Sequence, residues 1–347
     1  MFVWVILLSL VHFLQAENPW SCHQPLVEVT VSPLVSAESI RPLVVSWRVD
    51  KVQPGDHVVV YSTDSPEPLV TVPVDSLSGW ADTGLQESRN SSETLTFTEQ
   101  CLGYWAALRR ANSSQALASS CLGTAPRWME RQREAIQNMS LRNMFLPGTH
   151  NSAAYLESHL PFRETFVQKY AFNQDERVLN QLIYGARVLD LRVGHYPDTP
   201  EVWWANHAVV RLRPLFQILD DVKLFANKTE EIVILDVHHF PVGFQPEPLR
   251  VHQALVKYLE EMLEGYLISP SLGWGAPLSR LWQTGRTVVL SYNHQGPLDN
   301  QYLWPRVSHQ WGNVRSVTAL HEYFTRVFNR PPHGPWSAMA ELTPTAV

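Results

Sequence analysis

Three short runs of the chain carry side chains that handle protons or anionic oxygens. The run LPGTHNS contains His150, the run ARVLDLR ends in Arg192, and the run VWWANH ends in His207. Imidazoles donate and accept protons near neutral pH, and a guanidinium can bind two phosphate oxygens at once. Two imidazoles and one guanidinium are therefore suited to cleaving a phosphodiester without a metal ion.

Apolar runs that alternate with helical patterns would position these side chains. The pattern predicts helices at 175–184 and 214–226, and parallel strands at 144–146, 187–191, 202–205, 232–237 and 287–292, with later candidates at 315–318 and 336–342. This alternation is typical of an α/β fold with a parallel sheet and predicts an irregular TIM-like (β/α) barrel. Active sites of such barrels lie at the carboxyl ends of the strands, and four candidate side chains follow predicted strand ends: His150, Arg192, His207 and His238.

The N-terminal third has a different pattern, with short β-rich runs separated by turn residues. The runs at 43–49 and 57–61 flank the turn sequence QPGD and predict a hairpin, and further strands are expected at 69–74, 94–98 and 103–108. This spacing predicts an antiparallel β-sandwich without a catalytic constellation. The expected organisation is a β-sandwich-like domain at 17–125 and a barrel at 126–347.

The first residues, MFVWVILLSLVHFLQA, form an apolar stretch that is short for a membrane span and ends in a small residue. They predict a signal peptide at 1–16, with a retained membrane anchor as the alternative, and hence a secreted protein or one in the lumen of the secretory pathway. The sequons predict glycosylation at Asn90, Asn112, Asn138 and Asn227. The net charge of −6 offers no basic surface for nucleic acid.

The chain has three cysteines, Cys22, Cys101 and Cys121, and their spacing is not that of a metal site. In an oxidising compartment they allow one disulfide, which we expect between Cys101 and Cys121. The alternative is three buried, unpaired thiols.

From about residue 141 onward, four motifs in order resemble the X-domain of phosphatidylinositol-specific phospholipase C, in particular the X-domain-containing proteins. They are PGTHNS, NQLIYGARVLDLR, the histidine His207, and EIVILDVHHF. The resemblance implies an irregular β/α barrel in which His150 and His207 are the catalytic acid and base.

The resemblance also predicts whether the site binds a metal ion. Eukaryotic signalling enzymes of this superfamily bind calcium through an asparagine and acidic residues, and Asn151 and Asp190 match two of these ligands. Arg192 and His238 replace two others. Calcium takes about six to eight oxygen ligands, and a guanidinium would repel it. We therefore expect no metal and no cofactor, as in the metal-independent bacterial enzymes.

The implied reaction is attack of the inositol 2-hydroxyl on phosphorus in an inositol phospholipid or related glycolipid at a membrane surface. His150 would be the general base, His207 the general acid, and Arg192 would stabilise the phosphate charge. Asp190 could orient Arg192 or His150, although Arg192 could instead be only a structural ion-pair partner of Asp190. Asn151 could bind the phosphate or the hydroxyl.

Two more side chains are assigned to the substrate. His238 is expected to line the pocket. Tyr292 ends a predicted strand and could stack on the inositol ring, with a packed core tyrosine as the alternative. Nothing in the sequence indicates a protein partner.

The C-terminal part departs from the family pattern. Family members continue past the motif LTP (342–344) with a segment that holds the last barrel strand and an aspartate partner of the first histidine, whereas this sequence ends at Val347. The sequence therefore predicts a barrel without its last strand and a His150 without its orienting carboxylate. The alternative function is a catalytically impaired protein that binds a phosphoinositide or a protein. A glycerophosphodiester-type metal centre is disfavoured by Arg192.

Overall fold

The computed structural model describes residues 24–32, 41–87, 94–111, 113–155, 170–294, 296, 298 and 300–344. They form two compact units that divide between Thr124 and Ala125. The predicted signal peptide at 1–16, Cys22, and the sequons at Asn90 and Asn112 lie outside the described residues. Within the described ranges, no helix combines the length and the apolar character needed to cross a membrane.

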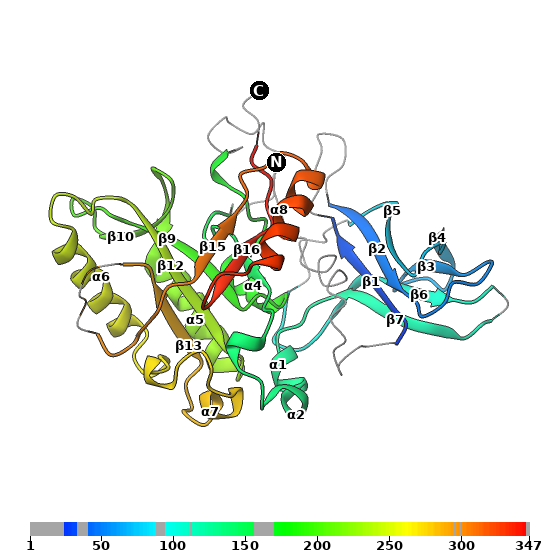
Figure 1. Cartoon of the computed structure of the whole chain (residues 1–347), viewed down its shortest axis with the longest axis horizontal. Helices are drawn as coiled ribbons and strands as arrows, with labels where there is room; N and C mark the ends of the chain where they lie inside the picture. The colour runs from blue at the N-terminus through cyan, green and yellow to red at the C-terminus, as the bar shows by residue number, and fades with distance from the viewer. Residues whose placement is uncertain are drawn as a thin grey trace. The chain divides into compact units, whose positions relative to one another are not determined.

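The N-terminal unit contains two antiparallel sheets (Figure 1), with strand orders β1-β2-β5 and β4-β3-β6-β7. From Leu43 onward, side chains along β2 alternate between buried and partly buried, and Leu43 and Val45 are fully buried. On β3, Val58 and Val60 are fully buried. The strands are β1 (Leu26–Val31), β2 (Pro42–Arg48), β3 (His57–Ser62), β4 (Pro68–Pro73), β5 (Ser78–Gln86), β6 (Cys101–Arg109) and β7 (Ala116–Gly123).

The predicted hairpin of β2 with β3 is wrong, because the two strands belong to different sheets. The turn itself forms, with the Asp56 N–H donating to the Gln53 carbonyl at 3.0 Å. However, the Val49 N–H bonds the Leu77 carbonyl, and the Asp56 carbonyl accepts from the Val74 N–H. Val49, just after β2, is therefore bonded next to β5 of the first sheet, and Asp56, just before β3, is bonded next to β4 of the second sheet. The turn between them carries the chain from the first sheet to the second.

The patterns also misplaced some strands of this unit. Residues 94–98 form no strand, while β5 and β7 were not predicted. Both of these strands are largely exposed, so their sequences lack a buried apolar pattern. The predicted disulfide is confirmed, since Cys101 on β6 is bonded to Cys121 on β7.

The C-terminal unit is built on a mixed seven-stranded sheet of order β11-β10-β9-β12-β13-β14, with β8 paired to β9 (Figure 1). The strands β8, β9, β12, β13 and β14 run parallel to one another. Its strands are β8 (Gly148–Thr149), β9 (Val188–His195), β10 (Trp203–His207), β11 (Val210–Pro214), β12 (Val233–Val242), β13 (Val288–Tyr292) and β14 (Leu303–Trp304). The described strands thus confirm an α/β unit, with a mixed sheet in place of an all-parallel one.

The predicted parallel direction of the strand at 202–205 is wrong. This strand, β10, pairs antiparallel with β9, and Ala205 lies opposite Val193. The connection at 196–202 is too short for the crossover of a dozen or more residues that a parallel pair requires. As a result β10 runs back alongside β9, and its last residue, His207, returns toward Arg192.

The predicted strands near the C-terminus also need correction. Residues 315–318 form no strand, because Ser316 caps the helix α8 (Val317–Asn329) by accepting a hydrogen bond from the Ala319 N–H at 3.2 Å. The strand expected at 336–342 is β16 (Trp336–Met339), which pairs in parallel with β15 (Ser308–Trp311) in a separate two-stranded sheet.

Helices of this unit bury apolar faces. The helix predicted at 214–226 is confirmed as α5, which buries Leu219, Val222 and Phe225 at helical spacing. The helix predicted at 175–184 is confirmed in part as the shorter α4. The helices of the unit are α1 (Trp128–Arg131), α2 (Arg133–Ile136), η2 (Leu141–Asn143), α4 (Val178–Ile183), α5 (Leu215–Lys228), α6 (Pro248–Met262), η3 (Pro270–Leu272), α7 (Leu278–Trp282) and α8.

A buried ion pair joins the starts of β9 and β12. Arg187 and Glu231 are both fully buried, and Arg187 Nε and Nη2 donate to Glu231 Oε2 at 2.8 and 2.6 Å. The remaining Arg187 donors reach backbone carbonyls, including that of Leu182 at 2.9 Å. Glu231 also accepts from the N–H groups of Met129 and Glu130. This end of the sheet is therefore fixed by a hydrogen-bonded charge pair.

Candidate active site

His150 lies at the centre of a polar cluster near the far end of the strands. It follows β8, and the next residue, Asn151, takes a left-handed backbone conformation with φ of 45°. Such a conformation is uncommon for residues other than glycine, and asparagine tolerates it better than most. The turn is held by the Asn151 N–H, which donates to Asp190 Oδ2 at 3.0 Å. The local fold thus places the His150 ring beside Asp190 and Arg192 of β9.

Arg192 and Asn151 both face the His150 ring. Arg192 Nη2 lies 3.3 Å from His150 Nε2, and Asn151 Nδ2 lies 2.9 Å from the same nitrogen. The side chains of His150 and Arg192 are 14% and 19% exposed, so a ligand can reach both. The structure therefore brings together the predicted base and the predicted phosphate-binding cation.

Asp190 lies beneath these two groups on β9. Its Oδ2 is 3.4 Å from His150 Nδ1 and 3.5 Å from Arg192 Nη2. Burial alone would raise the pKa of Asp190, but the charges of Arg192, His150 and His309 and the Asn151 N–H hold that pKa well below its usual range. Asp190 is therefore a carboxylate at neutral pH, and it contacts both side chains that it was predicted to orient.

His207 reaches the same region from β10. The His207 Nδ1 donates to the Ala171 carbonyl at 2.8 Å, which leaves Nε2 to carry a transferable proton. Burial lowers the pKa of His207, and the charges of Arg192 and His150 lower it further against the opposing effect of the Ala171 carbonyl. A histidine with a lowered pKa is a stronger acid when protonated, as a general acid requires.

His238 is placed beside a histidine that the sequence interpretation missed. Its ring stacks on His309 of β15 with a centroid distance of 3.6 Å and an angle of 6° between the planes. Burial, together with the charge of His309, lowers the pKa of His238 to about 4, so that His238 is neutral at pH 7. His309 lies in a short strand without a clear apolar pattern, so no sequence signal marked it.

His309 in turn bonds a buried carboxylate. Its Nε2 donates to Asp236 Oδ2 at 2.6 Å, and Asp236 Oδ1 accepts from the Ser291 hydroxyl at 3.0 Å. Burial alone would lower the pKa of His309, but the bond to Asp236 and the charge of Asp190 raise it. The ligand atoms of Asp236, His238 and His309 lie within 4.8 Å of one another, as a metal site would require.

A carboxylate that the sequence interpretation missed also reaches His150. Glu341 follows β16, and its Oε2 lies 3.0 Å from His150 Nδ1. The prediction that His150 lacks a carboxylate partner is therefore wrong. The rule that functional groups follow strand ends did not mark Glu341, because the strand was predicted at 336–342, whereas β16 ends at Met339.

Four buried polar atoms of the cluster have no hydrogen-bond partner among the described residues: Asn151 Oδ1, Asp190 Oδ1, Arg192 Nε and His238 Nδ1. Buried polar atoms are rarely left unsatisfied, and such exceptions call for a ligand or water. Two of these atoms are acceptors and one is a cationic donor. They suit a ligand with hydroxyl groups and an anionic group.

The residues at the predicted calcium positions do not fit calcium. The guanidinium of Arg192 lies within 3.5 Å of the carboxylate of Asp190 and contacts His150. A dication at this place would face a fixed positive charge and too few oxygen ligands.

Tyr292 lies in an aromatic cluster. Its ring is 5% exposed and packs against Phe240, and its hydroxyl bonds His252 Nδ1 at 2.8 Å. This burial favours the packed-core alternative for Tyr292 over stacking on a sugar ring. The predicted glycosylation sites Asn138 and Asn227 are exposed, and Asn227 precedes β12, the strand that carries His238.

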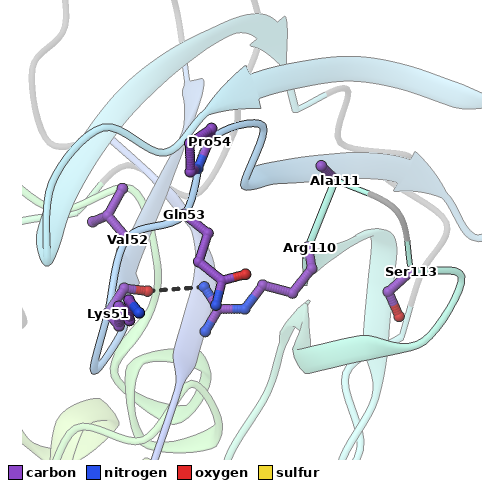
Figure 2. A pocket seen from close by; sticks show the side chains of 7 residues that line it. All are labelled: Lys51, Val52, Gln53, Pro54, Arg110, Ala111 and Ser113. Carbon is purple, nitrogen blue, oxygen red and sulfur yellow. Dashed lines mark hydrogen bonds between the residues drawn. The ribbon is translucent and has the colours of Figure 1, made fainter.

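The N-terminal unit has an open hollow that is unlike this cluster. Figure 2 shows its lining, which consists of Lys51, Val52, Gln53, Pro54, Arg110, Ala111 and Ser113. Arg110 donates to the Lys51 carbonyl at 2.8 Å and forms an ion pair with Asp56, so its charge is already engaged. The lining holds no acid–base pair.

Comparison with known proteins agrees with the motifs. PI-PLC X domain-containing protein 1 of Danio rerio is 25% identical over 217 residues, which cover 56% of this chain and 68% of that protein. PI-PLC X domain-containing protein 2 of Mus musculus is 23% identical over 239 residues, covering 62% and 69%. PI-PLC X domain-containing protein 1 of Homo sapiens is 26% identical over 225 residues, covering 58% and 68%. No protein-family model matches the chain.

Solved structures of phosphatidylinositol-specific phospholipases C have lower sequence identity to this chain than the curated relatives. Phosphatidylinositol-specific phospholipase C from Listeria monocytogenes is 17% identical with a TM-score of 0.45, over 60% of this chain and 74% of that one. The curated relatives confirm the predicted resemblance: this chain is similar to the PI-PLC X domain-containing proteins.

Proposed function

We propose that this chain is a phospholipase C that cleaves the phosphodiester of inositol phospholipids, or of related glycolipids, at a membrane surface and without a metal ion. The observation that carries the proposal is the contact of Arg192 with His150 beside buried, unpartnered acceptors. This arrangement offers a proton acceptor, a phosphate-binding cation and partners for hydroxyl groups in one place. The names of the curated relatives support the same class of enzyme.

In the proposed reaction the inositol 2-hydroxyl gives its proton to His150 Nε2, and its oxygen forms a bond to phosphorus. The bond from phosphorus to the diacylglycerol oxygen breaks, and His207 Nε2 protonates that oxygen. Arg192 binds the non-bridging oxygens and stabilises the charge that develops on them. The products are a cyclic inositol phosphate and diacylglycerol, and the two histidines have exchanged protonation states.

The proposal extends to the fold. The mixed sheet of the C-terminal unit would be part of an irregular TIM-like barrel, and the two antiparallel sheets of the N-terminal unit would form a sandwich. The parallel strands β8, β9 and β12 support the barrel, because His150 follows β8 while Arg192 and His238 lie on β9 and β12.

We also propose that the protein is a secreted or lumenal glycoprotein with a signal peptide at 1–16. The disulfide between Cys101 and Cys121 supports this, because disulfides persist in oxidising compartments. The exposed positions of Asn138 and Asn227 suit the attachment of glycans.

The test is release of inositol phosphate from phosphatidylinositol vesicles by the purified chain in the presence of a chelator. We expect activity in the wild type and a loss of about 100- to 10,000-fold in His150→Ala and in His207→Ala. His321→Ala, which changes an exposed histidine of α8, is the matched control and should keep full activity. A folded wild type without activity, even after calcium is added, would contradict the proposal and favour a binding protein.

A further inference from the structure

Asp236, His238 and His309 form a cluster of metal-ligating side chains that the proposed reaction does not use. Asp236 and His238 lie on β12 of the mixed sheet, and His309 lies on β15 of the separate two-stranded sheet. One ligand atom of each side chain lies within 4.8 Å of the other two. The cluster therefore spans two sheets of the C-terminal unit.

Asp236 is held in the way that ligating carboxylates are held. Its side chain is 1% exposed, its Oδ1 accepts from the Ser291 hydroxyl at 3.0 Å, and its Oδ2 faces His309 Nε2 at 2.6 Å. The Ser291 hydroxyl oxygen in turn accepts from the Val307 N–H at 3.2 Å. Hydrogen bonds to a ligating carboxylate fix its orientation and raise the affinity for the metal. Ser291 therefore supplies an outer shell for Asp236.

The two histidines offer nitrogen ligands in different ways. His309 Nε2 holds a proton that bonds Asp236, and a metal ion would take the place of that proton. The two rings are stacked with their planes 6° apart, so that an ion shared by both requires one ring to turn. His238 is the ring that turns, because its buried Nδ1 has no hydrogen-bond partner in the described part of the chain. His238 is also only partly buried, which gives an ion access to the cluster.

The donor atoms select the class of ion. Two imidazole nitrogens and one carboxylate oxygen suit Zn²⁺ and similar transition metals, whereas Ca²⁺ takes about six to eight oxygens. Two charged groups outside the cluster act on both histidines in opposite directions: Asp190 raises the pKa of His238 and of His309, and Arg192 lowers it. The carboxylate of Asp190 thus offsets the repulsion that Arg192 exerts on a cation.

We propose that Asp236, His238 and His309 bind a transition-metal ion of the zinc class, which fastens β15 to β12. Three protein ligands leave the fourth position of a tetrahedral ion to water. The ion takes no part in the proposed reaction, and its binding does not depend on that function. The sequence predicted no metal because His309 was not recognised as part of the site.

The first experiment titrates the metal-free full chain with Co²⁺, whose visible absorption reports the geometry of its ligands, and then displaces it with Zn²⁺. We expect saturation at one ion per chain in the wild type and loss of the bands in His309→Ala. Ser291→Ala should bind about 10- to 100-fold more weakly, because Asp236 loses its outer shell. His321→Ala changes an exposed histidine of α8 and should bind like the wild type.

An adventitious surface site would give the same affinity in all of these proteins, and that result would overturn the proposal. A folded wild type without Co²⁺ bands would also overturn it. His238→Ala gives the same readout if His309→Ala does not fold, since His238 Nδ1 has no hydrogen bond to lose among the described residues.

The second experiment measures amide hydrogen exchange of the full chain in Zn²⁺ and in chelator. We expect Zn²⁺ to slow exchange in β15 and β16, because local opening of this sheet would have to break the metal link. Exchange in β2 and β3 of the N-terminal unit should not change, and His309→Ala should remove the effect. Binding of Zn²⁺ without any change of exchange in β15 and β16 would overturn the proposed link between the sheets.

Discussion

The strands β9 and β12 carry charged groups at their start and again along their length, and the two groups differ in how fully their charges are paired. At the start, Arg187 and Glu231 are fully buried and hydrogen-bonded to each other and to the backbone. Further along the same strands, Asp190, Arg192 and His238 each keep a buried polar atom that has no partner among the described residues. The same two strands therefore carry one satisfied group of charges at their start and one unsatisfied group beyond it.

The difference separates stability from chemistry. Satisfied polar groups fix the packing of β9 against β12, while unsatisfied ones cost free energy unless a ligand binds them. In β/α architectures the carboxyl ends of the strands carry function and the opposite ends carry stability. The paired and unpaired charges of this sheet follow that division, so substitutions at the two ends should give opposite phenotypes.

The largest expected effect is on folding, in Glu231→Gln. This change leaves the buried Arg187 charge uncompensated and should lower the free energy of unfolding by about 3 to 5 kcal/mol. Chemical denaturation measures it. The matched control is Glu230→Gln, whose exposed ion pair with Arg133 should contribute less than about 1 kcal/mol. Equal free energies of unfolding in the two variants would show that the buried ion pair of Arg187 with Glu231 does not stabilise the fold more than the exposed pair.

The next effect is on activity, in Arg192→Lys. The lysine keeps the charge but loses the planar fork that binds two oxygens, so kcat should fall about 100-fold. The free energy of unfolding should stay within about 1 kcal/mol of the wild type, because Arg192 Nε has no partner to lose. Arg250→Lys, at an exposed position, is the control for activity. A large loss of stability with unchanged kcat would mean that Arg192 is only a structural partner of Asp190.

The smallest effect is the shape of the pH profile. His207 must be protonated to act as an acid, and burial with the charge of Arg192 lowers its pKa below the ordinary value of 6.5. Activity should therefore fall about tenfold per pH unit as pH rises above that lowered pKa, and the optimum should be acidic. Initial rates between about pH 4 and pH 8 measure this, with fluorescence at each pH as the control for folding. Activity that stays level up to pH 7 and begins to fall only above it would contradict the assignment of His207 as the acid.

Local patterns predicted part of the site well. His150 and Arg192 lie close together, as expected from their motifs. However, residues 144–146 form no strand, and Arg192 lies within β9 and does not follow it. The disulfide between Cys101 and Cys121 was also predicted, whereas the hairpin of β2 with β3 was wrong. A turn sequence specifies a change of direction, but the hydrogen bonds of Val49 and Asp56 with other strands decide which sheet the chain enters.

By itself, the sequence determined the apolar runs of β9, β12 and β13, the helix α5, and the resemblance to PI-PLC X domain-containing proteins. Periodicity and motifs are local properties of the chain, so they can be seen without a fold. Only the tertiary structure decided that β10 turns back to bring His207 toward Arg192, that His309 stacks on His238, and that Glu341 reaches His150. These contacts join residues far apart in the chain, and packing of β15 and β16 places them.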